Sequence, residues 1–221
     1  MNGLLAALRK ELLLQQRGAA QLFAVLVFGA TALLLFSFAV GPNAELLRRI
    51  APGLLWLALL LSSTLTLAES FQSEMEMKAL EGQLLLPASP AALYYGKALS
   101  NWLQLTLLGV LLVPLMVALY DASLPRPLAL LGVIALGAAG LSAPGTLYAA
   151  MTQQARSRQT LLPLLLFPLV VPVLIAAVKA TALLMHGDPM GQLRPWVQLL
   201  GAFDAIHWSL CGLLFGRVVE D

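Results

Sequence analysis

Long apolar runs without any charged side chain divide this chain into regular intervals. Asp, Glu, Lys and Arg are absent from residues 18–44, 50–68, 98–120, 127–155 and 159–178. A sixth interval, 195–216, is interrupted only by Asp204. A helix needs about 20 mostly apolar residues to cross a bilayer, so each interval can hold one span. The runs do not alternate with period two, which argues against strands.

We therefore predict an all-α polytopic membrane protein with six transmembrane helices. The approximate spans are 20–40, 52–68, 98–120, 128–150, 160–184 and 196–216. Asn43 follows the first span and is expected to cap a short external helix that runs to Ile50. Pro90 is expected to begin the helix that leads into the third span. No linker is long enough to separate domains, so residues 1–221 are expected to form one domain.

The composition agrees with this pattern and excludes other classes of protein. Hydrophobic residues make up 60% of the 221 positions and charged residues 11%, whereas an average soluble domain has about 25% charged residues. The mean hydropathy is +0.86. These values argue against a soluble enzyme and a disordered chain. Cys211 is the only cysteine, so a disulfide-stapled domain is also excluded.

The distribution of Lys and Arg predicts the orientation of the spans, because cytoplasmic loops are enriched in both. Eight lie on the side of the N-terminus, namely Arg9, Lys10, Arg17, Lys78, Lys97, Arg156, Arg158 and Arg217. Four lie on the opposite side, namely Arg48, Arg49, Arg126 and Arg194. Both termini are therefore expected in the cytoplasm. The net charge of +2 is not clustered into a stripe, so no nucleic-acid partner is expected.

Two segments outside the spans have a pattern of their own. Leu4, Leu5, Leu8 and Leu12 lie on one arc of an N-terminal helix, which predicts an interfacial helix or an extension of the first span. Residues 69–97 form the largest cytoplasmic piece and contain four of the eleven acidic residues. A short helix that exposes Phe71 and Met75 beside carboxylates suits docking into a groove of a partner protein. The alternative is a helix that only connects two spans.

Two features inside the spans are candidates for function. Pro163, Pro168 and Pro172 each remove a backbone donor, so the fifth span is either a flexible gating helix or a permanently bent one. Asp204 and His207 are three residues apart and share a helical face inside the sixth span. Ionisable residues at membrane depth are functional candidates. The alternative is a mutually hydrogen-bonded pair that faces a neighbouring helix.

The sequence lacks the motifs of an enzyme. No G-x-x-x-x-G-K-[ST] loop exists, since the only Gly-Lys pair, Gly96-Lys97, is followed by Ala98. No H-E-x-x-H or G-x-S-x-G motif is present. Three residues in all are Cys or His, which is too few for a zinc site built from these types alone. We expect no catalytic residue and no metal site in this chain.

Three stretches of the chain resemble a known family. Residues 41–56 read Gly-Pro-Asn-Ala-Glu-Leu-Leu-Arg-Arg-Ile-Ala-Pro-Gly-Leu-Leu-Trp and are followed by Leu60-Leu61-Ser62-Ser63. The second stretch is Phe71-x-x-Glu74 with Leu80-Glu81-x-x-Leu84-Leu85-x-Pro87. The third contains Ala143-Pro144-Gly145, Arg158, Leu161-Leu162-Pro163-Leu164, Pro168 and Pro172. Together they resemble the cytochrome c maturation haem exporter B family, which supplies the membrane subunit of an ABC transporter complex. Two positions depart from the family pattern, because Glu74 replaces Asp and Ala79 replaces Gly.

The resemblance implies a permease domain in the bacterial inner membrane and a set of partners. These are a P-loop ATPase subunit that binds ATP and Mg, a tryptophan-rich haem-handling membrane protein, a small single-span protein, a periplasmic haem chaperone and possibly a second copy of this chain. Residues 69–97 would contain the coupling helix, with the ATPase bound by Phe71, Glu74, Met75, Glu76, Lys78, Leu80 and Glu81. The four tryptophans are scattered, so haem is expected to bind the partner and no cofactor is expected on this chain.

The resemblance predicts that ATP hydrolysis by the partner drives haem export or the release of a haem-loaded periplasmic chaperone. Both activities remain open from the sequence. Two other classes of function are also kept. One is a proton-coupled carrier or intramembrane enzyme that uses Asp204, His207 and Lys179. The other is a structural scaffold for the haem-handling partner.

Overall fold

The structure is a computed structural model that describes residues 19–70, 90–152 and 158–220. These residues form six α-helices and, within these ranges, no strand. The helices are α2 (Ala19–Val40), α3 (Ala44–Glu69), α6 (Pro90–Tyr120), α7 (Pro127–Met151), α8 (Arg158–His186) and α9 (Leu193–Glu220). All six are long and apolar enough to cross a membrane, which confirms the predicted polytopic all-α fold. The interfacial helix expected within residues 1–17 lies outside the described residues.

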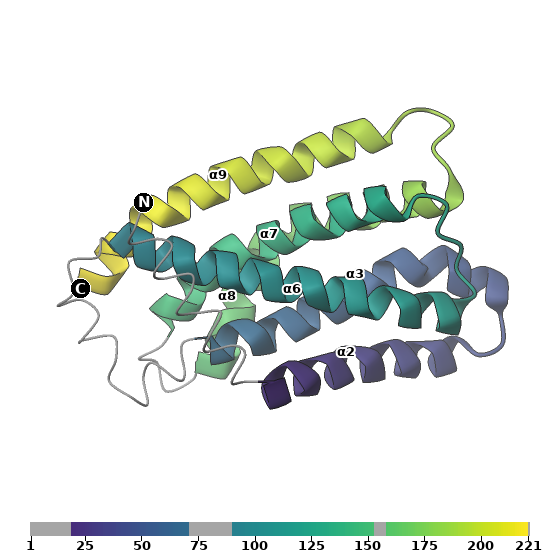
Figure 1. The fold of residues 1–221 in the computed structure, drawn as a ribbon, viewed down its shortest axis with the longest axis horizontal. Coiled ribbons are helices and arrows are strands. Elements are labelled where there is room, and N and C mark those ends of the chain that lie inside the picture. The colour runs from purple at the N-terminus through teal and green to yellow at the C-terminus, as the bar shows by residue number, and fades with distance from the viewer. Residues whose placement is uncertain (1–18, 71–89, 153–157, 221) are drawn as a thin grey trace.

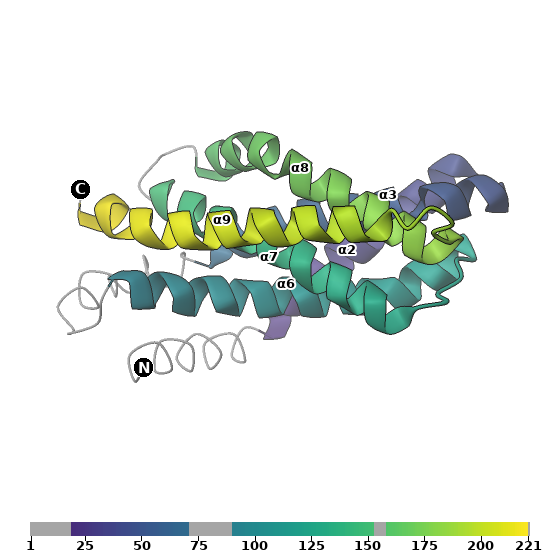
Figure 2. The same ribbon diagram turned by 90° about the horizontal axis from the view of Figure 1, so that it is seen from above.

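The six helices run back and forth in a bundle in which α7 is central (Figures 1 and 2). α7 packs against α3, α6, α8 and α9, whereas α2 packs mainly on α3 and α6. Helices α3, α7 and α9 finish at the end of the bundle where α6 and α8 begin. We call this end the Lys97 end, because Lys97 of α6 lies near it. We call the opposite end the Arg48 end, because Arg48 lies there in the second turn of α3.

Helix α3 differs from the prediction of a short external helix followed by a separate span. The carboxamide of Asn43 accepts a 3.0 Å hydrogen bond from the backbone N–H of Leu46, so the predicted cap is confirmed. The helix then continues through Pro52 without a break, so the separate short helix is wrong. Proline has no N–H and leaves the carbonyl four residues earlier without its helical partner. Here that carbonyl belongs to Arg48, and its oxygen lies 3.2 Å from Nε2 of His186 in α8.

The Arg48 end is held by contacts among α3, α6 and α8. The guanidinium of Arg48 forms an ion pair with the Asp121 carboxylate, and its Nε donates a 2.8 Å hydrogen bond to the Asp121 carbonyl oxygen. Asp121 has a positive φ of 49°, which lets the chain turn directly after α6. The ion pair is exposed, so we expect it to orient the helix ends more than to stabilise the fold.

Side chains from four helices tie the interior of the bundle together through hydrogen bonds. Trp56 of α3 donates from Nε1 to the hydroxyl of Thr181 in α8, at 3.0 Å. Four bonds join α6 to α7: Tyr94 Oη to Ala143 O, Ser142 Oγ to Ala98 O, Asn101 Nδ2 to Thr146 Oγ1 and Trp102 Nε1 to Ala135 O. Polar side chains at membrane depth need such partners, because no water is present to replace them.

Candidate functional site

The first candidate site is the pair of helix ends that flank residues 71–89. Helix α3 ends at Glu69, and Ser70 is its C-cap, with its N–H bonded to the Thr66 carbonyl oxygen. The Ser70 carbonyl oxygen accepts a 2.8 Å hydrogen bond from Nζ of Lys97, a residue of α6 that is 5% exposed. The last carbonyls of a helix carry partial negative charge and attract cations. The Lys97 side chain therefore connects the end of α3 to the first turns of α6.

The sequence predicts that Lys97 lies in the helix that begins at Pro90, directly before the charge-free interval of the third span. Helix α6 begins at Pro90 as predicted, and Lys97 lies within it. A charge is tolerated at this buried position because its ammonium group reaches the end of α3. The predicted coupling residues Phe71, Glu74, Met75, Glu76, Lys78, Leu80 and Glu81 lie outside the described residues. Their role stays a prediction.

The second candidate is the proline-containing helix α8. Pro163, Pro168 and Pro172 all lie inside one helix that the structure assigns without interruption from Arg158 to His186. Figure 2 shows that this helix does not run straight. Pro168 and Pro172 each leave a carbonyl four residues earlier without its helical donor, as expected from the missing N–H. A bent but continuous helix fits both of the predicted alternatives, so the gating role stays a prediction.

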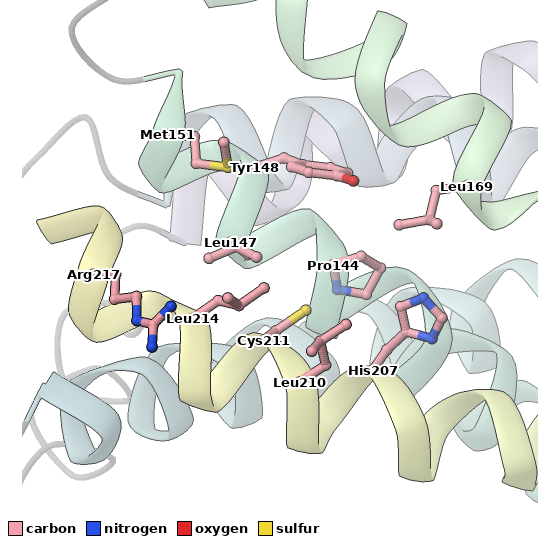
Figure 3. A pocket seen from close by; sticks show the side chains of 10 residues that line it. All are labelled: Pro144, Leu147, Tyr148, Met151, Leu169, His207, Leu210, Cys211, Leu214 and Arg217. Atoms are coloured by element: carbon pink, nitrogen blue, oxygen red, sulfur yellow. The ribbon is translucent and has the colours of Figure 1, made fainter.

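The third candidate is a cavity of about 410 Å³ between α7, α8 and α9. Figure 3 shows His207 and Arg217 at opposite ends of it, with Cys211 between them on α9. Helix α7 contributes Pro144, Leu147, Tyr148 and Met151, α8 contributes Leu169, and α9 adds Leu210 and Leu214. The lining is mainly apolar and carries one guanidinium at the Lys97 end. Sequence reasoning gave no signal for this cavity, because its walls come from three helices that are distant in the sequence.

His207 forms part of this cavity wall and has a defined orientation. Its Nδ1 lies 2.9 Å from the carbonyl oxygen of Phe203, and its ring stacks on the Phe203 ring with centroids 3.7 Å apart. A carbonyl can only accept, so Nδ1 donates in this contact and, in the neutral imidazole, Nε2 carries the lone pair.

Asp204 lies one turn before His207 on the same helix, but the two side chains do not form the expected pair. Both carboxylate oxygens of Asp204 are shielded from solvent and have no hydrogen-bond partner. The prediction of a mutually hydrogen-bonded pair is therefore wrong, because Nδ1 of His207 bonds instead to the backbone of Phe203. Lys179 of α8 does not bond to Asp204 either, so the three ionisable residues of the carrier hypothesis are not joined.

The neighbours of Asp204 come from two other helices and were not predicted. A Cβ atom added to Gly140 of α7 would lie 3.1 Å from Oδ1 of Asp204. The same atom would lie 2.9 Å from both methyl carbons of Val173 in α8. Helices α7, α8 and α9 thus meet around the Asp204 carboxyl at a position where even a methyl group would displace its neighbours. Glycines also serve many other close contacts between membrane helices, so the sequence alone could not single out Gly140.

Comparison with known proteins gives consistent matches over nearly the whole chain. The sequence model of the CcmB protein family matches residues 2–220. A relative from Pseudomonas aeruginosa named Heme exporter protein B is 37% identical over 198 residues, or 88% of this chain and 87% of that protein. Proteins of the same name from Haemophilus influenzae and Rhodobacter capsulatus are 35% and 37% identical. The matches span 78% and 77% of this chain, respectively, and 78% of the length of each relative.

Proposed function

Since this chain belongs to the CcmB protein family, we propose that it is the membrane subunit of a haem export complex used in cytochrome c biogenesis. In this proposal a separate P-loop ATPase binds the cytoplasmic segment 71–89. ATP hydrolysis in that partner moves the attached helices and drives haem export or the release of a haem-loaded periplasmic chaperone. The chain itself has no P-loop, so ATP and Mg bind the partner.

One observation supports coupling at segment 71–89 most directly. The two helix ends that flank the segment are joined by the hydrogen bond from Lys97 to the Ser70 carbonyl oxygen. A force applied to a segment with joined ends is passed to α3 and α6 together, rather than being absorbed by independent movement of either helix. Helix α6 is bonded in turn to the central helix α7 at four positions. The contacts thus form a continuous path from the segment to the middle of the bundle.

The proposed orientation places the Lys97 end in the cytoplasm of a bacterium, with the bundle in the inner membrane. The sequence predicts most of the Lys and Arg residues outside the spans on that side, which agrees with the positive-inside rule. The start of α2 and the end of α9 lie on this side, so both termini are proposed to be cytoplasmic. The ATPase would then reach the segment from the compartment that supplies ATP.

The remaining partners are proposed from the family resemblance. Haem binds primarily to a tryptophan-rich membrane protein, because the tryptophans of this chain are spread over three helices and are partly engaged in bonds between helices. A small single-span protein, a periplasmic haem chaperone and a second copy of this chain complete the proposed complex. A permease half of this kind is expected to consist of the whole chain as one domain.

The proposal is tested by purifying the complex with charge and size changes in segment 71–89. Glu81→Lys or Phe71→Ala should abolish copurification of the ATPase, because docking would depend on acidic and aromatic groups of a short helix. Glu45→Lys is the matched control, since Glu45 is an exposed acid in the first turn of α3 at the opposite end. Copurification at the wild-type ratio in both segment variants would refute docking at this site.

The two alternative functions make different predictions. A carrier that depends on Asp204 and His207 loses cytochrome c maturation in the double variant Asp204→Asn with His207→Ala. Full maturation in that variant removes the carrier hypothesis. The scaffold hypothesis is tested with a partner ATPase that cannot hydrolyse ATP. A scaffold still supports cytochrome c maturation with that partner, whereas a coupled transporter does not.

A further inference from the structure

The carboxyl group of Asp204 lies at a contact between α7, α8 and α9. Gly140 of α7, Val173 of α8 and Asp204 of α9 meet at one point, and a Cβ at Gly140 would crowd both neighbours, at 3.1 Å from Oδ1 and 2.9 Å from the Val173 methyls. Both carboxyl oxygens are shielded and lack a hydrogen-bond partner.

A negative charge at this point would be very unfavourable. An ionised carboxylate that is removed from water and left without a partner is strongly disfavoured, and such groups usually take up a proton instead. Titratable groups on α9 and on the helices packed against it include His207 and Cys211 on α9, Tyr148 on α7, Lys179 on α8, and Tyr94, Tyr95 and Lys97 on α6. None of them bonds to Asp204, so a proton is the one ligand that can neutralise the carboxyl where it lies.

The cavity begins one helical turn away from this contact on all three helices. Pro144 follows Gly140 by four residues, Leu169 precedes Val173 by four, and His207 follows Asp204 by three. Residues three or four apart on a helix share a face. The Asp204 contact therefore forms the end of the cavity that points toward the Arg48 end of the bundle. Any separation of the three helices at Gly140 would extend the cavity.

We propose that Asp204 is a proton-binding site whose occupancy holds α7, α8 and α9 together and closes this end of the cavity. When the proton leaves, the O–H bond of the carboxyl breaks and the proton passes to a water molecule that enters from the cavity. The resulting carboxylate needs water, so the three helices separate around it. This role is independent of ATPase docking at segment 71–89.

The proton is tested directly by infrared spectroscopy of the purified complex grown with carboxyl-labelled aspartate. The difference spectrum between wild type and Asp204→Asn should contain the C=O stretch of a protonated carboxylic acid at neutral pH, shifted in D2O. The chain's other aspartates are Asp121, Asp188 and Asp221, and they cancel in the difference. A carboxylate band in place of the acid band would overturn the proposal.

Closure of the cavity is tested through Cys211, the only cysteine of the chain, which lines the cavity and is 3% exposed. Its reaction with a membrane-permeant maleimide is followed by mass spectrometry in native membranes from neutral to alkaline pH. Residue 204 cannot ionise in the Asp204→Asn variant, so the pH dependence of its labelling rate reflects thiolate formation at Cys211 alone. The ratio of wild-type rate to Asp204→Asn rate should rise by up to about tenfold for each pH unit, as the ionised fraction does.

A third variant separates the contact from the charge. Gly140→Ala inserts a methyl group between Val173 and Asp204, so it should speed Cys211 labelling at every pH. A constant wild-type to Asp204→Asn ratio would show that the proton does not control the cavity. Labelling of Gly140→Ala no faster than wild type would show that this contact does not close it. If Asp204→Asn fails to fold, labelled wild type is used alone. Its acid band must then weaken as the pH rises, in parallel with faster labelling of Cys211. If the acid band and the labelling rate change independently, the proposal is refuted.

Discussion

The ammonium group of Lys97 in α6 lies 2.8 Å from the carbonyl oxygen of Ser70, the residue that ends α3. The two residues are 27 positions apart in the sequence, and the interval between them consists of segment 71–89 and the first two turns of α6. A buried lysine thus stabilises the end of one helix from within another. The contact fixes where the proposed ATPase-binding segment leaves the bundle and where it returns.

Replacing Lys97 by Met should separate docking from coupling. The variant keeps the length and apolar character of the side chain and removes the bond to Ser70. We expect ATPase copurification to stay at the wild-type level, while ATP-dependent release of haem or of the loaded chaperone falls several-fold. Stability should fall by about 2 kcal/mol, the usual contribution of a hydrogen bond to a charged group. Release assays on the purified complex measure the first effect and thermal unfolding the second.

Lys97→Arg is the matched control for that variant. It keeps a cationic donor, so it should recover part of the coupled release even if its packing is worse. If Lys97→Met and Lys97→Arg release cargo equally well at the wild-type rate, the Lys97–Ser70 bond has no role in coupling. Loss of ATPase copurification in Lys97→Met alone would instead place Lys97 within the docking surface.

Gly137→Ala should destabilise the bundle through a single methyl group. A Cβ at Gly137 would overlap the indole ring of Trp56, which is 1% exposed and bonded to Thr181. Overpacking a well-filled interior costs about 1–3 kcal/mol. Gly132→Ala lies on the same helix with open space beside it, so its effect should be neutral or stabilising by a few tenths of a kcal/mol. Unfolding in mixed micelles compares the two variants, and equal stability would contradict the packing around Trp56.

The Trp56–Thr181 hydrogen bond should make a modest contribution to stability. Thr181→Val leaves the buried indole N–H without its acceptor, whereas Thr181→Ser keeps a hydroxyl at the same place. Hydrogen bonds between membrane helices average about 0.6 kcal/mol in measured cases, so we expect a loss of about 1 kcal/mol for Val. A double-mutant cycle with Trp56→Phe isolates the pair. A coupling energy of zero would mean that the contact is not formed in the membrane.

The prolines of α8 allow a test of the gating hypothesis. The double variant Pro168→Ala with Pro172→Ala restores two backbone donors and removes the cause of the bend. If α8 bends during the cycle, unfolding should require a higher temperature while ATP-dependent release falls. If the bend only serves packing, the straightened helix fits the bundle less well, and both stability and release should fall. The two measurements together therefore distinguish a hinge from a fixed bend.

The number and approximate position of the membrane helices were predictable from the charge-free intervals, because a lipid-exposed charge is costly at membrane depth. The ends of the helices were less predictable. The sequence predicts Lys97 just outside the third span, yet its side chain is buried, because the end of α3 provides a partner for its charge. The sequence predicts Pro52 as the start of a span, yet α3 continues through it, since Nε2 of His186 lies beside the carbonyl that the proline frees.

The candidate site was predictable only in part. Asp204 and His207 stood out as ionisable residues in an apolar run, but their partners depend on how α7 and α8 pack. Gly140 and Val173 carry no local signal, and the cavity exists only between helices that are distant in the sequence. The expected bond between Asp204 and His207 failed because a helical backbone offers each histidine a nearer acceptor in its own previous turn.

The four bonds between α6 and α7 have a mechanical consequence. They extend over α7 from Ala135 to Thr146, about three helical turns, and three of them anchor on backbone carbonyls rather than on mobile side chains. The two helices can neither slide nor rotate against each other without breaking several bonds at once. They should therefore move as one rigid unit, so that a displacement of α6 shifts α7 by the same amount relative to α8.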